Sequence, residues 1–399
     1  MFGQVELLPA DPILGLIEAF NRDTNPNKID LGVGVYRDAQ GNTPILQAVK
    51  EAEALLLTRE KTKSYIGSHG DPAFGQQLLP LVLGQDSAVL QASRATLTQA
   101  PGGTGALRLA ADFIHRCAPG KKVWISDPTW PNHYAIFNAA GVEYASYRYV
   151  DSNTNRLDFP AMLADLQQIP EGDVVLLHAC CHNPTGFDLS LEQWQQVLEI
   201  LKARKLLPLI DFAYQGFGAG LEEDAAAVRL LAEQLPEVMI TASCSKNFGL
   251  YRERIGAFIA VAANRNDMEK VRSQLAVVAR SNYSNPPAHG SAIVATILAN
   301  PELNGLWRRE VDDMRNRINT LRQQFVDALK PFGLAEKFAC VAEQRGMFSY
   351  SGLKPEEVQK LQQEFGIYMV KTGRMNIAGY SEQNLQYLCK AIASVCGKA

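Results

Sequence analysis

The sequence predicts an α/β protein with an open sheet, and three observations support this fold class. Short apolar runs alternate with amphipathic helical patterns between residues 95 and 261, which is typical of β–α–β units and a mostly parallel sheet. Polar or Gly-rich segments follow most of these runs, at the carboxyl ends of the expected strands, where open α/β sheets bind ligands. A long helical pattern from residue 301 precedes a smaller group of strands and helices.

The composition is that of an ordinary globular protein. The 399 residues are enough for two domains or one large α/β unit, and 47% are hydrophobic and 20% charged. The net charge of −3, with Lys and Arg scattered along the chain, gives no electrostatic footprint for nucleic acid. Seven cysteines at irregular spacing suggest reduced thiols and a cytoplasmic protein. Neither a signal peptide nor a membrane-spanning run is expected.

The first part of the chain is punctuated by glycine and proline. Residues 31–36 form a Gly-interrupted apolar run, which we interpret as a bent edge strand, although glycines can also mark the close approach of a ligand. A helical pattern covers residues 47–57, and the loop at 64–70 contains Tyr65 and His69. A loop histidine of this kind is more often exposed and inert than part of a site.

The alternation of strands and helices begins at residue 95. A strand at 95–99 leads into the Gly-rich loop 100–105 and a helix at 106–116. Backbone N–H groups and the dipole of such a helix can bind an anion, but a Gly-rich turn alone is weak evidence for phosphate. The next strand, 123–126, ends shortly before Trp130. Two roles stay open for Trp130, namely contact with a ligand at the sheet edge or ordinary aromatic packing.

Two later strand ends also carry polar side chains. Strand 174–178 precedes Cys180-Cys-His-Asn-Pro184, in which adjacent Cys and His ligands would strain a tetrahedral zinc site, so no metal is expected. Asn183 instead presents its amide from a turn that the proline fixes. Strand 206–210 precedes Asp211, which needs a cationic partner, either a structural arginine or the protonated heterocycle of a ligand. The remaining elements are a strand at 142–149 and helices at 158–169, 190–204 and 222–235.

Lys246 lies between two expected strands, 238–242 and 255–261. Lysine is seldom placed at the mouth of a sheet for packing, because burial of its ammonium is costly. A lysine with a depressed pKa can condense with an aldehyde, and nearby serines and an arginine could hold a phosphate beside it. From this stretch alone, the alternative of a lysine that simply reaches water from a strand end carries equal weight.

The carboxyl-terminal part predicts a long helix at 301–329, which would span about 45 Å and connect two domains. We therefore expect three segments: an arm and part of a small domain at 1–44, a large domain at 45–300, and the interdomain helix with the small domain at 301–399. In the last segment, Arg374 follows a strand at 367–371, where an arginine can bind a carboxylate bidentately.

A lysine that forms an imine, a phosphate loop and an aspartate for a ring nitrogen are together what pyridoxal phosphate requires. Four longer motifs carry a resemblance to a family: Ser-Lys-Asn-Phe-Gly-Leu-Tyr at 245–251, His-Asn-Pro-Thr-Gly at 182–186, Asp-Phe-Ala-Tyr-Gln-Gly-Phe at 211–217 and Asn-Tyr-Ser-Asn-Pro-Pro at 282–287. In this order, and over essentially its whole length, the chain resembles the class I aminotransferases of the bacterial aspartate and aromatic amino-acid branch. The resemblance implies a fold type I pyridoxal-phosphate-dependent transferase, with a mostly parallel seven-stranded sheet flanked by helices and a smaller α/β domain.

The resemblance also implies residue roles in binding the cofactor. Lys246 would bind pyridoxal phosphate and shuttle protons, Asp211 would pair with the ring nitrogen, and Trp130 would stack on the ring. Tyr214 and Asn183 would hydrogen-bond the 3-oxygen of the ring. The phosphate contacts would come from Gly103, Thr104, Ser243, Ser245, Arg254 and, from the second subunit of a homodimer, Tyr65.

For the substrate, the resemblance implies that Arg374 binds the α-carboxylate with help from Asn183, Trp130 and the backbone of Gly34. Arg280 of the second subunit would bind the distal carboxylate of a dicarboxylic substrate. Supporting positions under the ring would belong to His133 and His178.

The implied reaction is transamination of aspartate, aromatic L-amino acids or both with 2-oxoglutarate, which gives the 2-oxo acid and L-glutamate. Thr104 and Asn285 look like aspartate-preferring members, whereas Cys244 and the loop around His69 resemble aromatic-preferring ones, so the preferred amino donor stays open. A decarboxylase or lyase on the same fold is a further alternative, against which the two carboxylate-binding arginines argue. A catalytically silent regulator that binds pyridoxal phosphate would be expected to carry an additional DNA-binding module.

Overall fold

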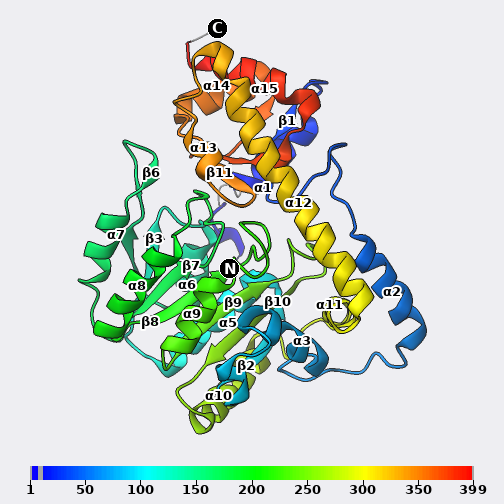
Figure 1. Cartoon of the computed structure of the whole chain (residues 1–399), viewed down its shortest axis with the longest axis vertical. Coiled ribbons are helices and arrows are strands. Elements are labelled where there is room, and N and C mark those ends of the chain that lie inside the picture. Colours follow the sequence, from blue (N-terminus) through cyan, green and yellow to red (C-terminus); the bar gives the residue numbers. More distant parts are fainter. Residues whose placement is uncertain (1, 8–11, 398–399) are drawn as a thin grey trace. The chain divides into compact units, whose positions relative to one another are not determined.

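The computed structural model describes residues 2–7 and 12–397, which form two compact units (Figure 1). The larger unit comprises Pro44–Arg317, and the smaller one combines the chain up to Thr43 with the chain from Ile318 onward. Helix α12 (Pro301–Ala328) runs from one unit into the other. The domain boundaries inferred from the sequence, at residues 44 and 300, remain predictions.

A seven-stranded sheet forms the centre of the larger unit. Its strand order is β2 (Ala95–Pro101), β10 (Ile255–Val261), β9 (Val238–Ser243), β8 (Leu207–Phe212), β7 (Val174–His178), β3 (Val123–Asp127) and β4 (Tyr144–Arg148). Strand β10 is antiparallel to both of its neighbours, whereas the pairs from β9 to β4 are all parallel. The prediction of a mostly parallel seven-stranded sheet is therefore confirmed.

Helices flank this sheet, and every residue of β7, β9 and β10 is buried, as expected for strands covered on both faces. The core between the sheet and its helices is apolar, with Leu107, Phe137 and Phe258 at its centre. The helices are α2 (Gln47–Arg59), α3 (Pro72–Leu83), α4 (Ala88–Gln91), α5 (Gly102–Cys117), α6 (Asn132–Ala140), α7 (Phe159–Leu166), α8 (Leu191–Ala203), α9 (Ala226–Gln234), α10 (Arg265–Asn282) and α11 (His289–Ala299). A two-stranded hairpin, β5 (Val150–Asp151) with β6 (Arg156–Leu157), follows β4.

Two details of this unit differ from the sequence prediction. The glycines that we expected in a loop before α5 form its first helical turn, since α5 begins at Gly102. Arg280, expected in a polar loop, lies in the last turn of α10. Buried residues such as Leu275 and Val278 hold α10 against the core, so the helix continues through the polar residues that follow.

The smaller unit contains helices α1 (Pro12–Arg22), α13 (Cys340–Glu343), α14 (Pro355–Phe365) and α15 (Glu382–Val395), with short 3₁₀ helices at Phe2–Gln4, Lys330–Phe332 and Ile377–Gly379. Strand β1 (Ile29–Asp30) pairs in parallel with β12 (Ile367–Tyr368), and β11 (Phe348–Tyr350) pairs antiparallel with β13 (Arg374–Asn376). Buried Arg322 donates to the carbonyl oxygens of Val341, Gly346 and Phe348, so one guanidinium fixes the chain that leads into β11. The expected edge strand at 31–36 is wrong, because these residues are irregular.

Among residues 2–7 and 12–397, no helix combines the length and apolar character that crossing a bilayer requires.

Candidate active site

Three neighbouring strands bring polar side chains to one edge of the sheet. His178 is the last residue of β7 and lies in register with Asp211 of β8, which in turn is paired with Thr241 of β9. Strand β9 ends at Ser243, three residues before Lys246. The parallel pairing therefore places the lysine, the aspartate and the histidine at the carboxyl ends of adjacent strands, where open α/β sheets bind ligands.

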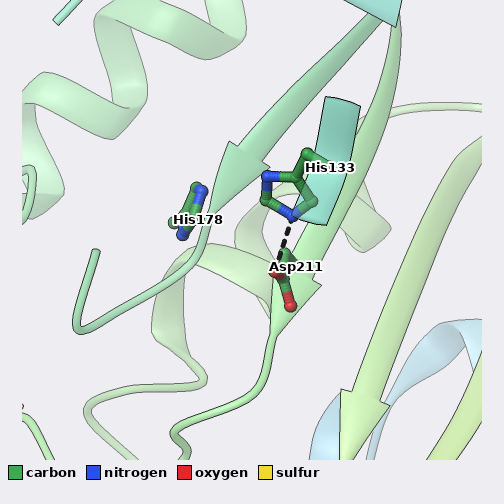
Figure 2. A group of neighbouring side chains, drawn as sticks. All are labelled: His133, His178 and Asp211. Atoms are coloured by element: carbon green, nitrogen blue, oxygen red, sulfur yellow. Dashed lines mark hydrogen bonds and ion pairs between the residues drawn. The ribbon is translucent and has the colours of Figure 1, made fainter. Parts of the chain in front are cut away.

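Asp211 belongs to a buried chain of hydrogen bonds, which we call the Asp211 network. Its Oδ2 lies 3.1 Å from Nε2 of His133, and Nδ1 of His133 lies 2.8 Å from Oγ1 of Thr129. Nε2 of His178 lies 3.4 Å from the same Thr129 oxygen. Figure 2 shows His133 above Asp211, with His178 beside them at the end of its strand.

Donors and acceptors fix the direction at both ends of this network. Since an ionised carboxylate only accepts, Nε2 of His133 donates to Asp211. Nδ1 of His178 accepts from the backbone N–H of Asn183 at 3.4 Å, so Nε2 of His178 carries the proton and donates to the Thr129 hydroxyl. The network thus connects Asn183 to Asp211.

Charge and burial set the protonation of the site. Burial raises the pKa of Asp211, but the hydrogen bond from His133 and the nearby positive charges outweigh it, so the net shift is downward. Burial lowers the pKa of His178 to about 3. Asp211 is therefore an anion, and His178 is a neutral member of the network, near neutral pH.

Lys246 lies over the ring of Tyr214, with 4.5 Å between its Nζ and the ring centroid. Burial lowers the pKa of Lys246 to about 8, the charge of Asp211 opposes this shift, and the charge of Arg254 adds to it. Far more of this amine is neutral at physiological pH than in an ordinary lysine, which is the form that attacks a carbonyl or accepts a proton.

The amino terminus of α5 lies next to serines and an arginine, and we call this group of residues the α5 cradle: Gly102, Gly103, Thr104, Ser243, Ser245 and Arg254. A Cβ on Gly102 would lie 2.6 Å from Nη2 of Arg254, and Gly102 has a φ of +72°, so the position requires glycine. A Cβ on Gly103 would lie 3.2 Å from Cβ of Ser243. The first turn of α5 has no side-chain cap and no acidic residue, and Arg254 and Ser243 lie against its first two glycines. Such a donor set suits a phosphate.

Trp130 and Asn183 complete the edge of the sheet. Trp130 is partly buried and meets the ring of His133 edge-on, with 5.3 Å between the ring centroids. Asn183 is buried and precedes a cis peptide bond to Pro184. Both residues therefore lie next to members of the Asp211 network.

Four other predicted site residues lie elsewhere. Tyr65 is 91% exposed, and Arg280 is exposed and donates to Oγ of Ser284 at 2.6 Å. Arg374 and Gly34 belong to the smaller unit. There the Arg374 guanidinium stacks on the ring of Phe348 at 4.2 Å, and it donates to the carbonyl oxygen of Gly32 at 2.7 Å.

His182 does not join a cluster with the cysteines that precede it, because its ring nitrogens bond Ser126 at 2.9 Å and Thr185 at 2.8 Å. The two adjacent thiols instead lie near Asp224, with ligand atoms within 4.8 Å of one another. Burial raises the pKa of the Cys180 thiol well above its usual value, which opposes the thiolate form that metals bind.

Two further residues, His69 and Cys244, bear on the substrate preference. Nδ1 of His69 lies 2.9 Å from Oγ1 of Thr98, and burial followed by the charge of Arg272 lowers its pKa. Cys244 is buried, which raises its thiol pKa. Near neutral pH, His69 is therefore a neutral imidazole and Cys244 a neutral thiol.

The sequence reasoning did not single out Thr129 or Phe348. Thr129 lies in Asp127-Pro-Thr-Trp-Pro131, directly after a strand, and a hydroxyl at such a strand end was a usable signal. Phe348 begins β11 far from Arg374 in sequence, and only the antiparallel pairing with β13 brings the two together. No local pattern could have indicated that contact.

Comparisons with known proteins agree with this geometry. A family model described as aminotransferase class I and II matches residues 26–392. The chain is 58% identical to an aromatic-amino-acid aminotransferase from Pseudomonas aeruginosa (99% of both chains) and 49% identical to an aspartate aminotransferase from Escherichia coli (99% of this chain and 100% of that one). The crystal structure of an aromatic-amino-acid aminotransferase from Burkholderia pseudomallei, covalently bound to pyridoxal phosphate, matches with a TM-score of 0.96 and 49% identity over 99% of both chains.

Proposed function

Because the chain belongs to the aminotransferase class I and II family, we propose that it transfers the amino group of aspartate, of aromatic L-amino acids or of both to 2-oxoglutarate. The products are the corresponding 2-oxo acid and L-glutamate. The family relationship confirms the predicted enzyme class and the pyridoxal phosphate cofactor. One observation carries the proposal: a lysine with a depressed pKa lies over Tyr214, beside the buried Asp211 carboxylate.

The residues present fit pyridoxal phosphate at both ends. In the α5 cradle, the absence of a side chain on Gly102 lets the Arg254 guanidinium approach the first turn of α5, where a methyl group would collide with it, so the arginine and the amino terminus of this helix lie together as donors for a phosphate. Gly103, Thr104, Ser243, Ser245 and Arg254 are proposed to bind the phosphate, together with Tyr65 of a second subunit. At the other end, Asp211 is proposed to bind the protonated ring nitrogen, since its own histidine partner holds it in the ionised form.

Pyridoxal phosphate, when bound, withdraws electrons from the substrate α-carbon. The proposed roles of the chain's own residues follow from their placement. Lys246 binds the cofactor and moves the α-proton through Nζ, while Trp130 covers one face of the ring. Tyr214 and Asn183 donate hydrogen bonds to the ring oxygen and stabilise its negative charge.

Substrate binding is assigned to two arginines. Arg374, whose guanidinium is oriented by Phe348 and by the carbonyl oxygen of Gly32, is proposed to bind the α-carboxylate. Gly34, Asn183 and Trp130 are proposed to contribute to substrate binding as well. Arg280 of the second subunit is proposed to bind the distal carboxylate. In this structure Arg280 is exposed near the end of α10, a placement that suits a residue supplied to another subunit.

A preference for aromatic amino acids is the second candidate. The Pseudomonas aeruginosa relative is an aromatic-amino-acid aminotransferase at 58% identity, and the Escherichia coli aspartate aminotransferase is 49% identical. A structure of an aromatic aminotransferase from Psychrobacter sp. B6, cocrystallised with aspartic acid, also matches with a TM-score of 0.97 and 40% identity over 99% of this chain and 100% of that chain. That protein supports the view that one site of this type accommodates both classes of substrate.

The two arginines provide the test. Arg280→Leu should lower kcat/KM for aspartate by roughly 10²–10⁴-fold, because removing one partner of a sealed ion pair costs about 3–5 kcal/mol. Phenylalanine has no distal charge, so the same variant should change its kcat/KM little. Arg374→Leu should impair both substrates alike. Equal losses for aspartate and phenylalanine in Arg280→Leu would exclude the distal-carboxylate role.

We also propose a cytoplasmic homodimer with shared sites. Tyr65 and Leu57 are 91% and 86% exposed in the single chain, which suits side chains covered by a second copy. Seven free cysteines suit a reducing compartment. Mixing Lys246→Ala with Arg280→Leu should restore activity toward aspartate, since each hybrid dimer holds one complete site. Failure of recovery after demonstrated subunit exchange would contradict shared sites.

A further inference from the structure

Two carboxylates outside the proposed contacts hold the loops that carry Asn183 and Tyr214. Asp188 accepts the backbone N–H of Cys181 at 2.7 Å and that of His182 at 2.9 Å. These are the two residues directly before Asn183. Cys181 has a φ of +53°, a backbone conformation that a residue with a side chain adopts only when its surroundings enforce it.

Asp224 holds the next loop in the same way. Its Oδ2 accepts the N–H groups of Gly216 and Gly218, both at 2.9 Å, and its Oδ1 accepts that of Ala219 at 2.8 Å. Asp224 is 6% exposed, so these bonds are made away from water. Tyr214 lies near the start of this loop, two residues before Gly216.

The two held loops touch each other. The Sγ of Cys181 lies 4.0 Å from the carbonyl oxygen of Tyr214, and the thiols of both adjacent cysteines lie within 4.8 Å of an Asp224 oxygen. The loops follow β7 and β8, which are adjacent parallel strands. Displacement of either loop is therefore transmitted to the other through direct contact.

We propose that Asp188 and Asp224 are positioning residues that jointly place the Asn183 amide and the Tyr214 hydroxyl for their common hydrogen-bond acceptor. The inference rests on the proposed function, because that acceptor is the oxygen on the cofactor ring. Two donors aimed at one oxygen must keep their separation to a fraction of an ångström, and backbone hydrogen bonds to fixed carboxylates supply that constraint. An asparagine cannot replace either aspartate. Both carboxylate oxygens accept hydrogen bonds, whereas the NH₂ group of asparagine only donates.

The first arm of the test uses the protein without cofactor. Amide hydrogen exchange in Asp188→Asn should accelerate in the peptide around 181–182, and in Asp224→Asn around 216–219. The matched control is Asp151→Asn, in the β5–β6 hairpin, where a carboxylate accepts the N–H of Asn153 at 2.8 Å. That variant should leave both loops unchanged. Unaltered exchange in the loops of the two test variants would overturn the proposal.

The second arm uses the holoenzyme and reads the pH midpoint of its visible absorbance. Donors to the ring oxygen stabilise its anion, so misplaced donors should raise this midpoint by about 0.5 to 1 pH unit in each test variant and not in Asp151→Asn. In a Tyr214→Phe background, Asp224→Asn should add a smaller shift, because only the part that reaches Asn183 through the contact between the loops remains. Faster exchange without a midpoint shift, or equal shifts in both backgrounds, would contradict a positioning role.

The two measurements also distinguish a failure of this proposal from a failure of the proposed function. If the protein binds no pyridoxal phosphate, the proposed function fails, while hydrogen exchange still reports on the carboxylates. If Asp224→Asn does not fold, Asp188→Asn carries the test, because Asp188 is only partly buried and accepts two backbone bonds.

Discussion

Asp211 and Arg254 are the charged side chains that shift the pKa of Lys246, and the surroundings of these two residues differ. Asp211 is 7% exposed and bonded to His133, within a buried network of hydrogen bonds. Arg254 is exposed, and within the described part of the chain it donates to the backbone carbonyl oxygens of Tyr251 at 2.9 Å and Pro101 at 3.5 Å. The end that is proposed to meet the ring nitrogen is thus held by internal hydrogen bonds, whereas the α5 cradle, the proposed phosphate site, contains an exposed arginine.

This difference follows from the chemistry of each end. A buried carboxylate must be stabilised before the ligand arrives, because an isolated buried charge is costly. A phosphate binds well to exposed donors, since its charge compensates an arginine and the dipole of α5 at once. We therefore propose that the Asp211 end governs chemistry and that the α5 cradle governs cofactor affinity.

The largest effect is expected at the Asp211 end. Asp211→Asn should lower kcat/KM by roughly 10²–10⁴-fold for every amino donor, since loss of one partner of a buried pair costs about 3–5 kcal/mol. The matched control is Asp173→Asn, a buried aspartate at the amino end of the same sheet that accepts from Trp124 at 2.9 Å. Folded Asp173→Asn protein should keep its activity. Similar losses in both variants would remove the special role of Asp211.

A smaller effect is expected at the α5 cradle. Arg254→Leu should weaken pyridoxal phosphate binding by about 10- to 150-fold, because a charged hydrogen bond contributes about 1.5–3 kcal/mol. At saturating cofactor, kcat should be nearly unchanged. Arg252→Leu, an exposed arginine two residues away, serves as the control and should bind normally. A large fall in kcat at saturation would contradict the assignment of this end to affinity.

The smallest expected effect is a change in the pKa of Lys246, in opposite directions in two variants. In the protein without cofactor, Lys246 should react with an amine-directed reagent at a rate that rises with pH and is half-maximal near its pKa of about 8. The Asp211 charge raises this pKa and the Arg254 charge lowers it. Asp211→Asn should therefore lower the midpoint, and Arg254→Leu should raise it. Peptide mass spectrometry across pH 6–10 measures both, and shifts of the same sign would refute the electrostatic account.

The two ends also differed in how far the sequence could predict them. Lys246 and Asp211 follow apolar strands directly, so strand alternation was enough to bring them to one edge of the sheet. His133 lies on α6, a helix of nine residues that the sequence reading did not recognise, and the resemblance alone implied its role. The hydrogen bonds of Thr129 depend on where α6 packs, which no local pattern reveals.

Packing over long sequence distances explains the other differences. Arg280 was expected in a loop, because polar residues surround it, but burial of Leu275 and Val278 extends α10 past it. Buried Arg322 in the middle of α12 looks like a surface residue in the helical pattern, and only its contacts with carbonyl oxygens around β11 explain it. Such residues are determined by tertiary contacts, which override the local preference.

The central claim is that Lys246, between these two ends, is the residue that binds the cofactor. The most direct measurement is borohydride reduction of the protein loaded with pyridoxal phosphate, followed by peptide mapping of the fixed label. The account predicts one labelled peptide, with the label on Lys246, and none in Lys246→Ala. A label on any other lysine, or an unchanged label in Lys246→Ala, would contradict it.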